Sequence, residues 1–156
     1  MNNAHRHSLW EEYCTDKGIS APCPPSDQFG DTPELADELV ALVLREQKQA
    51  TCELKTWFDS RGLTLPAIGD QWIIMDGSGA ERCIIETTQV DLCPVRQVDE
   101  AFAWDEGEGD RSLAFWKDAH DAYYERQAER DGFVYSDHMI CVCERFKLIW
   151  PTKTSD

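Results

Sequence analysis

The sequence predicts an α+β domain built as a small β-barrel with flanking helices. Strand-like patterns are short, helical patterns fall into separate stretches, and no internal repeat is visible along the 156 residues. Hydrophobic residues form 42% of the chain and six tryptophans can anchor an interior, so one sizeable core can be buried.

The N-terminal part is predicted to be separate from the main domain. Ser8 and Glu11 fit a capping box that opens a short helix, and Gly18 ends it. A proline-rich stretch at 21–26 then breaks regular structure. We therefore divide the chain into a helix and linker packed on the domain (1–28), the main domain (29–151) and a tail (152–156).

Two long helices are indicated by their termini. Thr32 can cap the first helix, and Pro33 suits its first position. The leucines and valines of this helix leave few polar positions, so it is largely buried and brings Lys48 close to the core. The second helix covers about 112–130 and ends before Gly132.

Strands are predicted at 71–75 and 82–90, joined by a tight turn. The last strand covers 140–150, where side chains alternate between two faces and Glu144 falls on the apolar one. Two short helices complete the pattern, around 57–58 and at 98–104.

The seven cysteines do not show the spacing of a metal site or a disulfide framework. There is no CxxC pair, and no histidine stands at ligand spacing from a cysteine. Cys141 and Cys143 are two residues apart in a strand, so both point to one face. An odd number of cysteines without an export signal favours reduced thiols used as small apolar residues. We therefore predict no metal site.

Thirty acidic against fifteen basic residues give a formal net charge of −15. Binding to a phosphate backbone depends on lysine and arginine, so an extended surface for a long duplex is excluded. The charge favours a small ligand or a few nucleotides. No apolar run is long enough to cross a bilayer, and no signal-peptide pattern is visible, so we expect no membrane contact and a cytoplasmic location.

Lys48 and Thr51 lie where the first long helix gives way to a strand pattern. Side chains that leave a helix and enter a sheet can converge on one pocket. A desolvated lysine amine can be neutral and basic, and a hydroxyl beside it can become a nucleophile. The alternatives are a solvated loop lysine and an ordinary β-branched strand residue.

A second unusual stretch, 102–112, is acidic, contains two glycines and opens the second long helix. In a solvated loop, Asp110 or Ser112 would simply cap that helix. Arg111 in the first turn would be unfavourable for the helix dipole, so we expect a tertiary or functional partner for it. His120 shares a helical face with aromatic residues, which favours a core or pocket-wall histidine.

Together these segments resemble the ASCH domain family, whose members have a PUA-like β-barrel, and in particular its longer bacterial subgroup. The resemblance covers 29–150, nearly the whole predicted domain. The matching segments are 29–31, 33–39, 48–52, 65–66, 69–70, 85–88, 102–103, 106–113 and 143–146.

The ASCH family is associated with RNA binding, and some members are described as ribonucleases. A smaller branch hydrolyses the acetyl amide of N4-acetylcytidine. By this resemblance Thr51 would be the nucleophile and Lys48 its general base, while Glu106 would orient a substrate amine or relay a proton. The resemblance would place substrate binding on charged residues of the acidic loop and the last strand: Glu108, Asp110, Arg111 and Arg145.

This chain departs from the family at Glu46, where many relatives carry a glycine. An acid two residues before Lys48 can keep the amine charged, which favours anion binding over base catalysis. Three functions remain open. They are a module that binds a small nucleoside, a nucleotide or short single-stranded RNA between barrel and helices, an amidohydrolase of acylated nucleosides, and a ribonuclease with metal held by the acidic loop. No cofactor is predicted.

Overall fold

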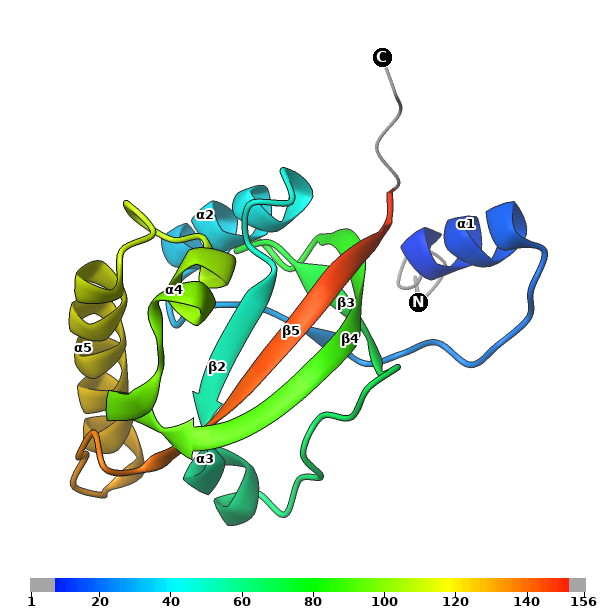
Figure 1. Ribbon diagram of the computed structural model, residues 1–156. Coiled ribbons are helices and arrows are strands. Elements are labelled where there is room, and N and C mark those ends of the chain that lie inside the picture. Colours follow the sequence, from blue (N-terminus) through cyan, green and yellow to red (C-terminus); the bar gives the residue numbers. More distant parts are fainter. Residues whose placement is uncertain (1–7, 152–156) are drawn as a thin grey trace.

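A computed structural model describes residues 8–151, and the residues at 1–7 and the predicted tail at 152–156 lie outside the described part. Five strands form one curved sheet in the order β1-β3-β4-β5-β2 (Figure 1). The strands are β1 (Ser26–Asp27), β2 (Ala50–Leu54), β3 (Gln71–Met75), β4 (Glu81–Pro94) and β5 (Ile140–Trp150). The helices are α1 (Ser8–Lys17), α2 (Pro33–Leu44), α3 (Lys55–Ser60), α4 (Glu100–Glu106) and α5 (Leu113–Asp131).

Pairing within the sheet is antiparallel except between β1 and β3. Two irregularities in the register between β4 and β5, at Ile84/Ile85 and Thr87/Gln89, let β4 bend. In the described part of the chain β1 and β2 each have one partner and form the two ends of the sheet. The α+β class is therefore confirmed, while the sheet curls without closing and the PUA-like barrel is only approximate.

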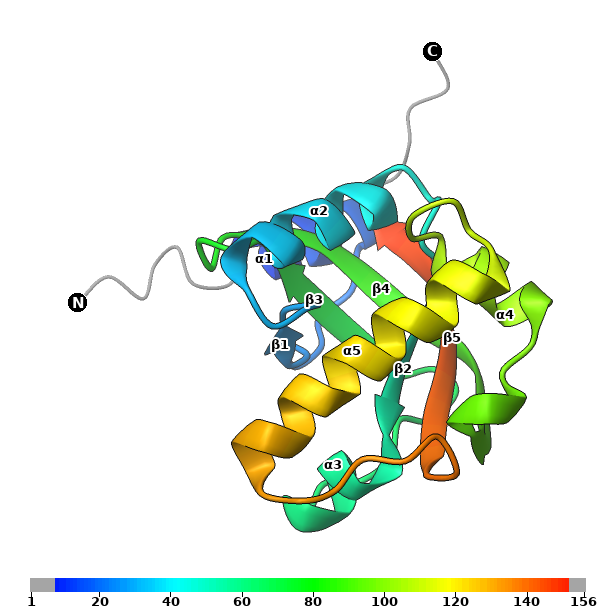
Figure 2. The same ribbon diagram turned by 90° about the vertical axis from the view of Figure 1, so that its left-hand side faces the viewer.

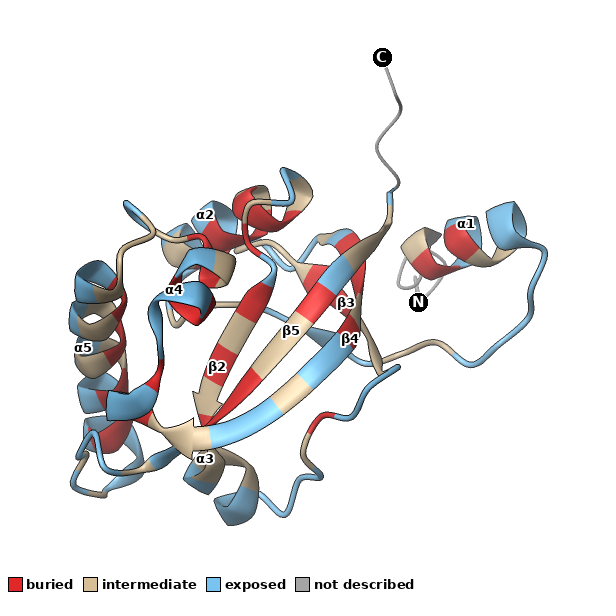
Figure 3. Cartoon of the chain, viewed as in Figure 1, coloured by how far each residue is buried: buried red, intermediate tan, exposed pale blue. Residues whose placement is uncertain are grey.

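The helices cover the sheet in three packing groups. α4 and α5 pack on β2 and β5 through a cluster that includes Trp116 and Tyr124. α2 packs through Val40 and Val43 on β3 to β5, and both α2 and α5 cross the sheet in Figure 2. α1 packs Trp10 against Ile73 of β3 and Ile84 of β4. Buried residues accordingly lie on the inner sides of these elements (Figure 3).

The ends of the long helices are confirmed as the sequence predicts. The Thr32 hydroxyl accepts a hydrogen bond from the Leu35 amide at 3.1 Å, and Pro33 opens α2. The Ser112 hydroxyl caps α5, and Gly132 ends it with a left-handed φ of 76°. No helix in residues 8–151 is long and apolar enough to span a membrane.

Two predicted boundaries are wrong. β4 continues to Pro94, because β5 is long enough to pair with it as far as Ile140. The helix predicted at 98–104 begins at Glu100, since the Asp99 carboxylate caps it by accepting from the Phe102 amide at 3.0 Å. This two-residue shift brings Glu106 into the last turn of α4.

Candidate functional site

The turn after α2 delivers Lys48 to the interior. The amides of Gln47 and Lys48 both donate to the carbonyl of Leu42, so the chain reverses tightly at the end of the helix. Glu46 adopts a left-handed backbone with φ 60°. Glycine reaches that conformation without a Cβ penalty, whereas a residue with a side chain, such as Glu46, is strained in it.

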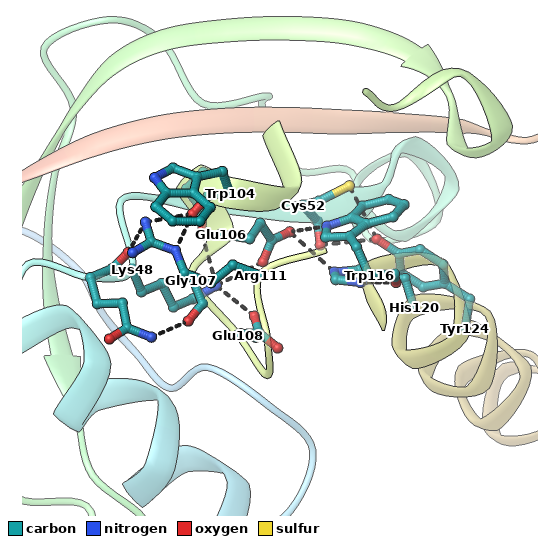
Figure 4. A network of polar contacts seen from close by, with 12 residues as sticks. Lys48, Cys52, Trp104, Glu106, Gly107, Glu108, Arg111, Trp116, His120 and Tyr124 are labelled. Carbon is teal, nitrogen blue, oxygen red and sulfur yellow. Dashed lines mark hydrogen bonds and ion pairs between the residues drawn. The ribbon is translucent and has the colours of Figure 1, made fainter. Parts of the chain in front are cut away.

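The ammonium group of Lys48 is completely enclosed. Its residue is 2% exposed, and Nζ donates to the Ala50 carbonyl, to Glu106 Oε2 and to Glu108 Oε2, each at 2.8 Å (Figure 4). An ammonium has three protons, so every donor of Lys48 has an acceptor. The expected approach of Lys48 to Glu106 is therefore present, with Glu108 as an additional partner.

The second oxygen of Glu106 faces α5. Oε1 accepts from Trp116 Nε1 at 3.1 Å and lies 3.1 Å from His120 Nε2. His120 Nδ1 lies 2.9 Å from the Trp116 carbonyl, and the two rings are stacked with centroids 4.0 Å apart. A carbonyl and a carboxylate are both acceptors, so both ring nitrogens of His120 must donate. The geometry thus describes an imidazolium.

Charge pairing determines the protonation of this network. Burial alone would lower the pKa of Lys48, but Glu106 and Glu108 outweigh it and raise that pKa above its ordinary value. Burial alone would raise the pKa of Glu106, but Lys48 and His120 hold it well below its usual range. The resting site therefore contains a charged lysine and an ionised glutamate, not a neutral amine.

Glu108 is the outermost member of the network, with its side chain 18% exposed against 2% for Glu106. Burial, followed in importance by the attraction of Lys48 and the repulsion of Glu106, leaves the pKa of Glu108 raised. Of the two carboxylates on Lys48, Glu108 is therefore the one that a ligand or a proton can displace at lower cost.

Stability is expected to depend on the charge of His120. Burial opposes the imidazolium, but Glu106 and Glu108 raise the pKa of His120 above its unfolded value. A raised folded pKa gives stability that is present below about pH 6.5 and is lost as the pH rises through the folded value. We expect His120→Gln to remove this decline in unfolding free energy between pH 6 and 9, measured in urea.

The exposed His138 provides the control for this experiment, because its side chain is 71% exposed. His138→Gln should leave the pH profile unchanged. If the unfolding free energy of His120→Gln still falls in full between pH 6 and 9, the pH dependence comes from another group.

The loop between α4 and α5 is tied to the turn that carries Lys48. The Gln49 amide donates to the Asp105 carbonyl at 2.6 Å, and Gln47 Nε2 donates to the Gly107 carbonyl at 2.7 Å. Gly107 has φ 74°, and a Cβ on it would stand 2.3 Å from the Gln47 carbonyl oxygen. This close approach keeps Glu106 and Glu108 over Lys48.

Arg111 lies on the outside of this loop. Arg111 precedes the Ser112 cap and has φ 66°, so the prediction that it lies in the first turn of α5 is wrong. Its guanidinium lies 3.8 Å from the ring centroid of Trp104 and donates from Nε and Nη2 to the Trp104 carbonyl at 2.9 and 2.7 Å. A longer bond of 3.4 Å reaches the Gln47 carbonyl. Arg111 therefore has tertiary partners, as expected.

A cavity of about 540 Å³ opens beside this stacked pair. It is lined by Glu100, Ala101, Trp104, Arg111, Ser112 and Leu113. Trp104 is 56% exposed, an unusual degree for an indole.

Thr51 is not joined to the Lys48 network. It pairs with Glu144 on β5, and strand alternation turns its side chain away from the face of Ala50. In the described part of the chain, no hydrogen bond links Thr51 to Lys48 or Glu106. The Glu144 carboxylate, which falls on the apolar face of β5 in the sequence pattern, accepts a hydrogen bond from the Thr87 hydroxyl.

The other predicted binding residues take separate places. Arg145 Nε contacts Asp105 at 2.9 Å, and its guanidinium lies 5.1 Å from the Phe102 ring centroid. The Asp110 carboxylate accepts from the Ser112 amide at 2.9 Å at the start of α5. Of the residues predicted for the site, Glu106 and Glu108 converge on Lys48, whereas Arg111 alone lines the cavity.

Trp116 and His120 belong to the network but were not predicted as site residues. The available signal was their spacing of four, which puts both on one face of α5. What the spacing does not reveal is that Glu106, from another helix, lies opposite them.

The comparisons with known proteins agree with this architecture. A family model described as the ASCH domain matches residues 26–150. The crystal structure of an ASCH domain from Lactobacillus crispatus JV V101 is 32% identical over 94% of each chain, with a TM-score of 0.85. Protein EF3133 from Enterococcus faecalis V583 is 26% identical over 94% of this chain and 88% of its own, with a TM-score of 0.87. No curated protein matches.

Proposed function

This chain belongs to the ASCH domain family, and on that premise we propose that it binds a nucleoside or a short single-stranded RNA beside α4 and the loop that carries Arg111. The observation that carries this proposal is the exposed Trp104 ring, stacked with Arg111 along a cavity of about 540 Å³. Cavities of roughly 300–1,000 Å³ are typical of small-molecule sites.

Stacking supplies the recognition of a base. An exposed indole or a guanidinium plane can pack against an unstacked nucleobase, and such contacts are the usual basis of single-strand binding. Trp104 on α4 and Arg111 on the loop that follows provide both kinds of surface side by side. The net charge of −15 limits the ligand to a few nucleotides, because a long phosphate backbone would be repelled.

Arg111 is also available for a phosphate. Among residues 8–151 its hydrogen bonds go to backbone carbonyls and no ion pair joins it to a carboxylate. Arg61 makes a useful contrast, since it lies 4.5 Å from the Trp57 ring centroid but is paired with Asp131 at 3.2 Å. An unneutralised guanidinium in so acidic a chain is a favourable anion contact.

We expect Trp104→Ala to weaken binding of a labelled short oligoribonucleotide by about tenfold or more, because a stacked base contributes about 1–3 kcal/mol. Arg111→Gln should weaken binding and reduce its salt dependence. Fluorescence anisotropy at two salt concentrations measures both effects. Arg61→Gln is the matched control and should bind as the unmodified chain does. Unchanged affinity in both the Trp104 and the Arg111 variants would exclude this surface.

A second candidate, hydrolysis of an acylated nucleoside, is favoured by the direct contact between Lys48 and Glu106. For Thr51 to attack an acyl carbon, its proton must pass to a neutral amine. Lys48 would first have to give its own proton to a carboxylate such as Glu108, and Thr51 would have to come within reach of the freed amine. We expect N4-acetylcytidine deacetylation, followed by chromatography, to disappear in both Lys48→Ala and Thr51→Ala. Turnover that survives both changes would rule out these residues as the catalysts.

A further inference from the structure

Four cysteines from three strands gather beneath α5, away from the Lys48 network. Cys52 is on β2, Cys93 near the end of β4, and Cys141 and Cys143 on β5; we call these four the thiol cluster. Register explains the convergence, because Cys52 pairs with Cys143 and Cys93 pairs with Cys141. All four are free thiols, and only Cys93 is partly exposed.

The sulfur atoms have the spacing of metal ligands. The Sγ atoms of Cys52, Cys141 and Cys143 all lie within 4.8 Å of one another. Cys141 Sγ is 3.6 Å and Cys93 Sγ is 4.0 Å from Cys143 Sγ. Four sulfurs placed tetrahedrally at about 2.3 Å from a zinc ion are about 3.8 Å apart. The distances of 3.6 and 4.0 Å lie on either side of that value. The Cys93 sulfur is outside the group of three mutually close sulfurs, so it must move nearer to complete the tetrahedron.

We propose that the thiol cluster binds one thiophilic d¹⁰ cation, Zn²⁺ in the first instance, with Cys52, Cys141 and Cys143 as three thiolate ligands and Cys93 as the fourth. This site is independent of the proposed ligand-binding surface at Trp104. Its ligands come from different strands, so no CxxC motif marks it in the sequence.

Proton balance makes the binding dependent on pH. A cysteine sulfur binds such a cation as a thiolate, so each of the four must be deprotonated in the bound state. Each thiol gives up its proton as its metal–sulfur bond forms, so one Zn²⁺ releases up to four protons to solvent. No electron is transferred, and no oxidant is needed.

The surroundings suit a closed thiolate site. The Tyr124 hydroxyl lies 3.3 Å from Cys52 Sγ as a donor, and also donates to the Cys52 carbonyl at 3.0 Å. Apolar side chains, including Val95 and Phe102, enclose the rest of the cluster. Four thiolates and one Zn²⁺ together carry a net charge of −2. Cys93 is partly exposed, so part of this charge is in contact with solvent.

Cobalt provides a direct test. The full-length protein is reduced, freed of metal with a chelator, desalted and titrated with Co²⁺. We expect one equivalent to produce the intense visible bands of tetrahedral thiolate coordination, and Zn²⁺ to abolish them. Zn²⁺ should also release protons in weak buffer and raise the melting temperature, reversibly with chelator. A folded protein that shows no cobalt–thiolate band would overturn the proposal.

Variants identify the ligands. Cys52→Ala/Cys141→Ala should lower Co²⁺ affinity at least a hundredfold, whereas Cys83→Ala should not, although Cys83 is equally buried in a different cluster. Circular dichroism checks that each variant is folded. If the double variant does not fold, Cys93→Ala replaces it and should shift the cobalt spectrum. Bands that survive unchanged in these variants, or a Cys93–Cys141 disulfide forming in place of metal binding, would contradict the assignment.

Discussion

Replacing Lys48 by methionine is expected to lower the free energy of unfolding by about 3–5 kcal/mol. The change leaves Glu106 ionised in the interior with His120 as its remaining charged partner, and it leaves Glu108 without a cation. The loss of one member of a buried pair costs more than the pair contributes, because the other charge stays desolvated. Urea unfolding at pH 7 measures the effect.

Lys55 offers a matched control on the surface. Its ion pair with Asp59 has the same length of 2.8 Å, but the two side chains are 38% and 55% exposed. Lys55→Met should therefore cost less than about 1 kcal/mol. Equal losses in the two variants would mean that Glu106 is rehydrated when Lys48 is removed. If Lys48→Met loses more stability than Lys55→Met, adding Glu106→Gln to Lys48→Met should recover part of that loss. A double-mutant cycle would measure the recovery.

The substitution Gly107→Ala should have the second largest effect, a loss of about 3 kcal/mol or more in unfolding free energy. Its Cβ would meet the Gln47 carbonyl oxygen at 2.3 Å and the Lys48 Cα at 3.0 Å, and φ is 74°. Backbone atoms cannot rotate away as the end of a side chain can. The loop must therefore lift off, which separates Glu106 and Glu108 from Lys48.

Gly132→Ala separates this close approach from backbone strain. Gly132 has a similar φ of 76°, but no heavy atom lies within 4 Å of the added Cβ. It should lose only about 1–2 kcal/mol, the cost of a left-handed conformation for alanine. Similar losses in both variants, measured by denaturant unfolding, would show that the loop relaxes away from Gln47 without penalty.

Local chemistry explains which parts of the fold could be predicted. Thr32 with Pro33, and Ser112 with Gly132, define the ends of α2 and α5 through hydrogen bonds made within the helix termini themselves. The strand order is different. Pairing of β2 with β5 rests on contacts between distant parts of the chain, and no local pattern specifies it.

The site was only partly predictable for the same reason. Lys48 and Glu106 are both predicted, the latter by resemblance alone, because the predicted helix ends at 104 and leaves Glu106 as one of several acids in the loop that follows. Its burial depends on Lys48, Trp116 and His120, which come from two other parts of the chain. The spacing groups Thr51 with Lys48, but Lys48 lies in the turn before β2, and alternation within β2 turns the Thr51 side chain away from the face of Ala50.

The cysteines show the limit of spacing rules most clearly. That Cys141 and Cys143 share a face follows from strand periodicity, and their sulfurs are indeed 3.6 Å apart. The addition of Cys52 and Cys93 follows only from the register of two strand pairs. A search for ligands close in sequence cannot find a set assembled across a sheet.

The pairing of β2 with β5 also bears on how the chain folds. Ala50 must find Arg145 across most of the domain, whereas β3 and β4 are joined by a short turn. Contacts that close long loops are costly in entropy and tend to form slowly. We therefore expect Lys48, just before β2, to stay hydrated until that edge docks and to be desolvated late in folding. We expect its ion pair to govern how fast the native chain opens more than how fast it forms.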